Sequence, residues 1–173
     1  MADLLTENFF GEMQRCAYEN GVLYQSEASG RQMFMYDPLN YQSRNDLPIG
    51  EFWRQPTDLR VDCRVAASVA HTYNRPVVGA EAFTTVDGGL RNAPFDFKAL
   101  GDMAFCEGVN RFYIHRYCMQ PWNVEPGITF SHFGINFDRT QTWWENGGKA
   151  WCDYLSSCQA LLQAGVFVAD VIH

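Results

Sequence analysis

The sequence of 173 residues predicts an α/β protein built from repeated β-α units with parallel strands. Segments with apolar residues at helical spacing alternate with short apolar segments that are typical of buried strands. Long polar and aromatic connections follow the strands, whereas the connections that lead into strands are short. Alternation of this kind joins parallel strands through right-handed crossovers.

The predicted elements follow in order from the N-terminus. The first is a helix over residues 6–21, with Thr6 suited to the N-cap and Gly21 acting as a stop signal. A short strand that ends at Glu27 and a long irregular loop over 30–56 come next. The remaining elements are a helix over 57–75, a strand over 76–84, a helix over 95–109, a strand over 111–119, a helix over 142–165 that is weakened near Gly147, and a strand over 166–173.

The four predicted strands are too few to close a (β/α) barrel, which needs eight. The chain is therefore a single small domain with an open sheet or one part of a larger barrel. The last strand stops at His173, where a post-strand loop would begin, and this favours the second alternative. We expect residues 1–173 to form the second half of a (β/α)8 barrel that lacks its first strands and its last.

Composition excludes several kinds of partner. A formal net charge of −7 and the lack of a basic stripe argue against nucleic acid. No segment approaches the roughly twenty apolar residues of a membrane span, and no secretory signal is recognisable. The cellular location stays open. The six cysteines have neither metal-type spacing nor the density of a disulfide scaffold, so we expect them to be small buried hydrophobic residues.

Acidic residues stand where the strands are expected to end. Glu27 and Glu81 lie at two strand ends, His115 at a third, and Asp170 on the last strand. Two carboxylates across a concave site suit glycoside hydrolysis, in which one protonates the leaving oxygen while the other activates water or attacks the sugar. The alternative is structural: each glutamate pairs with an arginine such as Arg111 or Arg116, or caps the following helix.

Aromatic residues accompany these acids. Glu51 is followed closely by Trp53 within the long loop, so it is either a solvated loop residue or a third acid of the site. Trp122, Trp143 and Trp144 lie on or beside the loop after the third strand. Indole rings there suit stacking against the apolar face of a sugar, and ordinary packing is the alternative.

Several motifs in order resemble one known family. The segments PIGEFW, GAEAFT, DFKALGDMAFCEGVNRFYIHRYCMQPW and PGITFSHFGINFDRTQTWW resemble the glycoside hydrolase family 106 α-L-rhamnosidases, and the similarity runs from about Glu27 to Asp170. The resemblance implies a (β/α)8 catalytic barrel and hydrolysis of terminal α-L-rhamnosyl groups by inversion. It also implies a calcium ion near the sugar, whose ligands the sequence does not identify.

The resemblance assigns roles to particular residues. Glu81 in GAEAFT is the expected catalytic carboxylate, Glu27 the expected second one, and Glu51 in PIGEFW a further site residue or an alternative to Glu27. The substrate-binding candidates are His115, Trp122, Asn136, Arg139, Trp143 and Trp144. Inversion requires room for water, so we expect the carboxyl carbons of two of the three glutamates to lie roughly 6.5–9.5 Å apart, whereas about 5 Å would indicate retention.

Further expectations concern the setting of the chain. The partner is a carbohydrate that contains L-rhamnose, and the parent protein of such a piece is typically exported by a glycan-degrading bacterium. Exposed sheet edges favour self-association, and the isolated piece is expected to be inactive. Two other readings stay open: a non-catalytic carbohydrate-binding or interaction module, and another barrel glycosidase such as a β-galactosidase.

Overall fold

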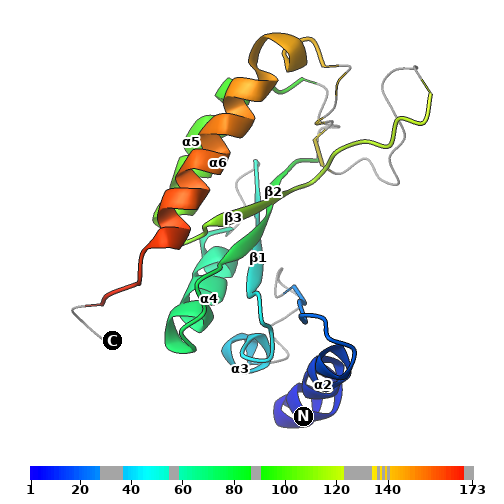
Figure 1. Cartoon of the computed structure of the whole chain (residues 1–173), viewed down its shortest axis with the longest axis vertical. Coiled ribbons are helices and arrows are strands. Elements are labelled where there is room, and N and C mark those ends of the chain that lie inside the picture. Colours follow the sequence, from blue (N-terminus) through cyan, green and yellow to red (C-terminus); the bar gives the residue numbers. More distant parts are fainter. Residues whose placement is uncertain are drawn as a thin grey trace.

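The computed structural model describes residues 1–27, 37–54, 59–86, 91–122, 134–135, 137, 139 and 141–169. Its centre is a sheet of three parallel strands, β1 (Ile49–Trp53), β2 (Gly79–Thr84) and β3 (Arg111–Ile114), in the order β1-β2-β3 (Figure 1). Helix α4 (Leu59–Thr72) connects β1 to β2, and α5 (Pro94–Cys106) lies between β2 and β3 in the sequence. The predicted α/β class with parallel strands is therefore confirmed.

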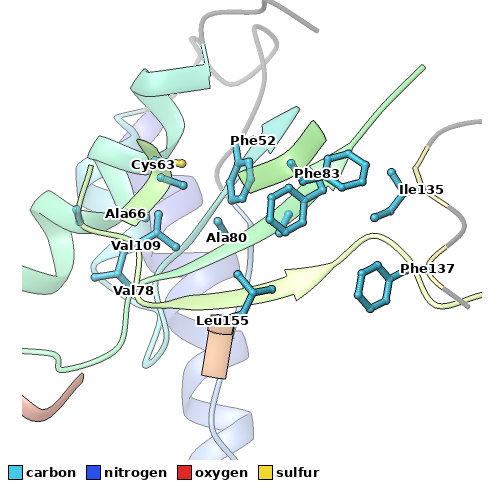
Figure 2. Packing of buried hydrophobic residues seen from close by; sticks show 14 of the residues in the cluster. Phe52, Cys63, Ala66, Val78, Ala80, Phe83, Val109, Ile135, Phe137 and Leu155 are labelled. Atoms are coloured by element: carbon cyan, nitrogen blue, oxygen red, sulfur yellow. The ribbon is translucent and has the colours of Figure 1, made fainter. Parts of the chain in front are cut away.

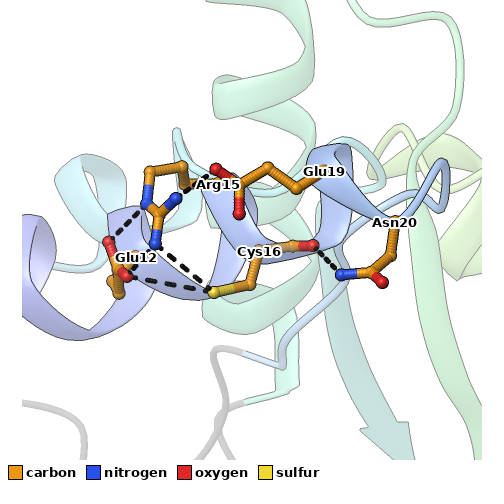
Figure 3. A network of polar contacts seen from close by, with 5 residues as sticks. All are labelled: Glu12, Arg15, Cys16, Glu19 and Asn20. Atoms are coloured by element: carbon orange, nitrogen blue, oxygen red, sulfur yellow. Dashed lines mark hydrogen bonds and ion pairs between the residues drawn. The ribbon is translucent and has the colours of Figure 1, made fainter.

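The first predicted helix is present as one helical run. It comprises α1 (Ala2–Leu5), a π-helical segment η1 (Thr6–Gly11) and α2 (Glu12–Glu19). The run stops at Gly21, whose φ of 68° is costly for residues with a side chain. Figure 3 shows the exposed face of α2, where Arg15 contacts Glu12 and Glu19. These ion pairs are more than half exposed, so they add little stability.

The remaining helices are α3 (Pro38–Gln42), the π-helical segment η3 (Trp144–Gly148) and α6 (Lys149–Ala164). Asp37 caps α3 by accepting hydrogen bonds from the backbone N–H groups of Leu39 and Asn40. Helices α5 and α6 lie alongside each other (Figure 1), and the Tyr154 hydroxyl donates a hydrogen bond to Asp102 between them. None of the described helices combines the length and apolarity required to cross a bilayer.

One face of the sheet packs against the helices. At Gly50 a Cβ atom would stand 2.5 Å from the backbone oxygen of Asp62, so β1 and α4 touch backbone to backbone. Phe83 is fully buried and its ring lies 5.0 Å from Phe52 and 5.2 Å from Phe97, between ring centroids. Figure 2 shows this cluster, to which Ile135, Phe137 and Leu155 also belong.

The predicted strands differ from the observed ones in four places, the first being the strand predicted over 111–119, which ends at Ile114 as β3. The segment PIGEFW, expected to be a loop, is strand β1; its Pro and Gly obscure the strand pattern because both are uncommon within strands. The predicted strand ending at Glu27 is reduced to one isolated parallel bridge between Glu27 and Ile49. Its apolar residues Val22 and Leu23 are more than half exposed, so they do not mark a buried strand.

The predicted last strand is also absent over residues 166–169, the part of it that the structure describes. Val166 and Val168 are 82% and 78% exposed, because this segment makes no ladder with the described sheet. All six cysteines are free, but the expectation that they are buried holds only for Cys63 and Cys118, because Cys16 and Cys106 are exposed and Cys152 and Cys158 are partly buried.

Candidate active site

Glu51 and Glu81 are neighbours on the sheet. They are paired in the register of β1 and β2, and Tyr113 of β3 is the next residue in the same row. Side chains alternate between the two faces of a strand. Because Phe52 and Gly50 face the helices and the core, Glu51 and its row lie on the opposite face. Glu51 is thus a sheet residue and not the solvated loop residue that was the alternative.

Buried amide side chains place Glu27 beside this row. Asn45 is fully buried, and its Oδ1 accepts hydrogen bonds from the backbone N–H and the hydroxyl of Ser26 at 2.9 and 2.8 Å. Its Nδ2 donates to the Ser26 carbonyl at 2.6 Å and to Gln42 at 2.7 Å. Gln42 in turn donates to the carbonyl of Ile49 at 2.9 Å. The residue before Glu27 is therefore tied to the start of β1 through side chains.

The three glutamates meet in space. One carboxylate oxygen from each of Glu27, Glu51 and Glu81 lies within 4.8 Å of the other two. All three side chains are partly accessible. At 4.8 Å each pair of charges repels by about 3.5 kcal/mol for an effective dielectric constant near 20, and by about 0.9 kcal/mol in bulk water. A shared proton, a bound cation or both would relieve this repulsion.

The spacing of the carboxyl groups is compatible with both stereochemical outcomes, inversion and retention. Each oxygen lies about 1.2 Å from its carbon, so oxygens within 4.8 Å limit the carboxyl carbons to about 7.2 Å. That limit includes the lower end of the range for inversion and the shorter separation for retention. The predicted separation of carbons therefore stays a prediction.

Glu81 has defined hydrogen-bond partners. The hydroxyl of Thr84 donates to Glu81 Oε1, and Nδ1 of His115 lies 3.4 Å from the same oxygen. Thr84 Oγ1 lies 3.3 Å from His115 Nδ1, and Arg116 Nη1 lies 3.1 Å from His115 Nε2. The arginine pairing considered for Glu81 is thus replaced by contacts with a threonine and a histidine.

A β-bulge brings Thr84 to Glu81. Residues three apart on a regular strand face opposite sides. The register pairs Phe52 with Ala82 but Trp53 with Thr84, so Phe83 is an extra residue. Its φ of 66° turns the ring into the core and returns Thr84 to the face of Glu81. Bulges of this kind often re-aim side chains beside active sites.

The predicted substrate-binding residues divide into two groups. Trp122 is 65% exposed, and Arg139 is exposed, so both are accessible to a ligand. Trp143 and Trp144 are partly buried against the core, and Trp143 Nε1 donates to the carbonyl of Asn92 at 2.9 Å. Their packing alternative therefore has direct support in these contacts.

Two predicted residues, Asn136 and Asp170, lie outside the described residues. Conversely, the sequence did not single out Thr84 or Tyr113, and it offered Arg116 only as an ion-pair partner. A regular strand would place Thr84 on the far face from Glu81, so no periodic signal could have identified it. Tyr113 could have been found from the parallel register of the two strands predicted over 76–84 and 111–119.

The fold and the site together define a class of protein. Carboxylates on neighbouring parallel strands, beside an imidazole and a tyrosine of the next strand, form the kind of site that glycoside hydrolases use. Over residues 1–173 the sequence matches the family of α-L-rhamnosidases, glycoside hydrolase family 106. The chain belongs to this family.

Two relatives extend this result. A rhamnosidase from Novosphingobium sp. PP1Y superposes with a TM-score of 0.88 at 35% sequence identity, covering 98% of this chain and 17% of that one. A protein of Formosa agariphila named "Putative beta-glucuronidase" is 34% identical over 172 residues, which are 99% of this chain and 14% of that protein. The chain thus spans between a seventh and a sixth of the length of these relatives.

Proposed function

We propose that this chain supplies acidic residues to the active site of an α-L-rhamnosidase that hydrolyses terminal α-L-rhamnosyl groups of glycans by inversion. The observation that carries the proposal is the meeting of Glu27, Glu51 and Glu81. Membership of the rhamnosidase family supports the substrate class. The partner is then a carbohydrate that contains L-rhamnose.

The charge of the site helps to choose between the sugars named for the two relatives. Rhamnose is neutral, whereas glucuronic acid carries a carboxylate. A cluster of three glutamates within 4.8 Å would repel a second anion unless a cation intervened. Without a bound cation, the acidic site therefore favours a neutral sugar over a glucuronide.

The roles of the glutamates follow from their partners. Because the Thr84 hydroxyl directs its proton at Glu81 Oε1, this carboxyl group accepts hydrogen bonds, as a base does. Glu81 would therefore activate the attacking water. Glu27, the expected second catalytic carboxylate, would donate a proton to the glycosidic oxygen as the general acid.

A calcium ion is a further part of the proposal. Carboxylate oxygens are the hard ligands that Ca²⁺ prefers, and Glu51, the glutamate of the cluster with no part in proton transfer, would supply some of the six to eight oxygens it needs. When bound, the ion would offset the mutual repulsion of the three glutamates. The donor set fits, and sugar hydroxyls or water would complete the shell.

Terbium luminescence tests the calcium site without an activity assay. Trp53 lies on the same strand face as Glu51, two residues along β1, so its excitation should sensitise bound Tb³⁺. We expect an emission signal that Ca²⁺ displaces and that Glu51→Gln weakens. Glu107→Gln is the matched control, because Glu107 pairs with Arg64 elsewhere. Emission that survives in Glu51→Gln at full strength contradicts this site.

Hydrolysis of p-nitrophenyl α-L-rhamnoside tests the activity. In the protein that contains this chain, Glu81→Gln should lower kcat by about 10²–10⁴-fold, the usual contribution of a general base. Glu107→Gln should match the wild type, and NMR of the first product should show the inverted anomer. Full activity of Glu81→Gln rejects the proposal, and rhamnoside binding without turnover in the wild type would indicate a binding module.

The sheet edges support a proposal about self-association. Strand β3 pairs only with β2 among the described strands, so its other edge can pair with added chain. Sedimentation of the isolated chain should show dimers that dissociate on dilution. A monomer at all concentrations would contradict this.

A further inference from the structure

A chain of contacts leads from Arg116 to Glu81. Arg116 Nη1 lies 3.1 Å from Nε2 of His115, and the other ring nitrogen, Nδ1, lies 3.4 Å from Glu81 Oε1. Nδ1 also lies 3.3 Å from Thr84 Oγ1, whose hydroxyl donates to Glu81. The imidazole thus stands between a guanidinium group and a carboxylate.

Only one placement of the protons satisfies the donors and acceptors in this series of contacts. A guanidinium nitrogen only donates, so Nε2 must accept and must carry no proton. A neutral imidazole then carries its proton on Nδ1, which faces Thr84 Oγ1 and Glu81 Oε1. An imidazolium or the opposite tautomer would set two donors against each other at 3.1 Å.

The backbone holds the ring in this position. His115 N–H donates to the carbonyl of Ala82, and the His115 carbonyl accepts from Ile135 N–H at 2.9 Å. Gly134 lies against the ring: a Cβ there would be 2.8 Å from His115 Nδ1, and its φ is 95°. A side chain at residue 134 would displace the imidazole.

We propose that Arg116 fixes His115 in the neutral tautomer protonated at Nδ1, and that His115 and Thr84 together orient Glu81 through Oε1, leaving Oε2 for the reaction. His115 is then a positioning residue for the base and not a ligand of the sugar, the role the sequence indicated. The catalytic consequence rests on the proposed function of Glu81. The tautomer itself does not.

Long-range ¹H–¹⁵N NMR of the folded chain tests the tautomer directly, because the two ring nitrogens of each tautomer have distinct shifts. The chain contains four histidines, and His115→Asn identifies the signal that belongs to residue 115. We expect the Nδ1-protonated pattern in the wild type and in Arg116→Lys, which keeps a donor. Arg116→Met should shift the ring toward the mixture found in free histidine.

A wild-type signal from the Nε2-protonated tautomer or from imidazolium at pH 8 overturns the proposal. If Arg116→Met does not fold, as judged by circular dichroism, the wild-type spectrum alone decides. An unchanged tautomer in folded Arg116→Met also overturns it.

Kinetics test the positioning role in the protein that contains this chain. Asn carries an amide nitrogen near the place of Nδ1, whereas Gln carries one near Nε2. We expect His115→Asn to retain kcat within about tenfold and His115→Gln to lose about 100-fold with little change in KM, as for a misplaced catalytic group. A rise in KM with kcat preserved would show a sugar ligand instead.

The two proposals fail separately. Full activity of Glu81→Gln would remove the proposed function while the NMR result still decided the tautomer. An Nε2-protonated His115 together with an inactive Glu81→Gln would refute only the positioning inference.

Discussion

The bulge at Phe83 makes a testable prediction about stability. Its φ of 66° lies in the left-handed region, where a residue with a Cβ is strained by about 1–2 kcal/mol and glycine is not. The perturbation is a pair of variants, Phe83→Ala and Phe83→Gly. The control is Ala82→Gly at the preceding residue, which is equally buried and is not among the residues with positive φ.

The expected losses of stability are sums of contributions that the variants have in common. Removing the fully buried ring of Phe83 costs about 3–5 kcal/mol in both variants. Replacing Ala by Gly at a strand residue normally costs about 0.5–1 kcal/mol of backbone entropy. It also loses one buried methyl group, which is worth about 0.8 kcal/mol. At Ala82 these terms add to roughly 1.5 kcal/mol. At residue 83 the relief of strain offsets them, so the two variants should be almost equally stable.

Urea unfolding followed by circular dichroism measures this difference, in a buffer with an osmolyte that keeps the weaker variants folded. The cost of Ala-to-Gly should be about 1–2 kcal/mol smaller at residue 83 than at residue 82. Equal costs at the two residues would refute the left-handed conformation of Phe83. They would also remove the reason for Thr84 to lie on the face of Glu81.

Three other variants probe the parts that support the site. Gly50→Ala should destabilise the fold by more than about 2 kcal/mol in urea unfolding, because the added Cβ would lie 2.5 Å from a backbone oxygen. Gly147→Ala is the control and should be neutral or stabilising, because a Cβ at residue 147 meets open space. Asn45→Ala should lower the free energy of unfolding by about 3 kcal/mol, because it leaves buried polar groups of Ser26 and Gln42 unpaired. Thermal unfolding measures this loss, and a loss below about 1 kcal/mol would contradict the hydrogen bonds of Asn45. Burial raises the pKa of the Cys63 thiol from 9.0 to about 12. Between pH 9 and 12 the unfolded chain ionises this thiol and the folded chain does not, so the free energy of unfolding should fall as the pH rises through this range. Iodoacetamide should leave folded Cys63 unlabelled at pH 8.

Much of the fold could be predicted from the sequence because its helices have strong periodic patterns. The helices over 57–75 and 95–109 correspond to α4 and α5, and the helix over 142–165 corresponds to η3 together with α6, with small differences at their ends. The strands were harder. β1 was missed because a five-residue strand with a central glutamate carries little local signal, and its stability comes from pairing with β2 and packing on α4.

The site could be predicted in its residue types but not in its geometry. Glu27, Glu51 and Glu81 were all chosen from the sequence, and the structure brings them together. The contacts around Glu81 depend on a bulge and on the approach of Gly134 to His115. Both are long-range features, which no short window of sequence encodes.

The three neighbouring glutamates repel one another and so lower the stability of the fold, and Glu51→Gln measures this effect. The substitution removes two of the three repulsive pairs, each worth about 0.9–3.5 kcal/mol at 4.8 Å, and the partial accessibility of the side chains places each pair near the lower value. We expect the free energy of unfolding to rise by about 1–3 kcal/mol in a chelator at pH 7. High salt should reduce the gain because the side chains are partly accessible, and calcium should abolish it by binding the wild type. The control is Glu107→Gln, which breaks the pair with Arg64 and should lower stability slightly with or without calcium. If Glu51→Gln instead lowers the free energy of unfolding in the chelator, Glu51 has a stabilising structural partner that outweighs the repulsion. Repulsion among three charged carboxylates is then not the dominant interaction at this site.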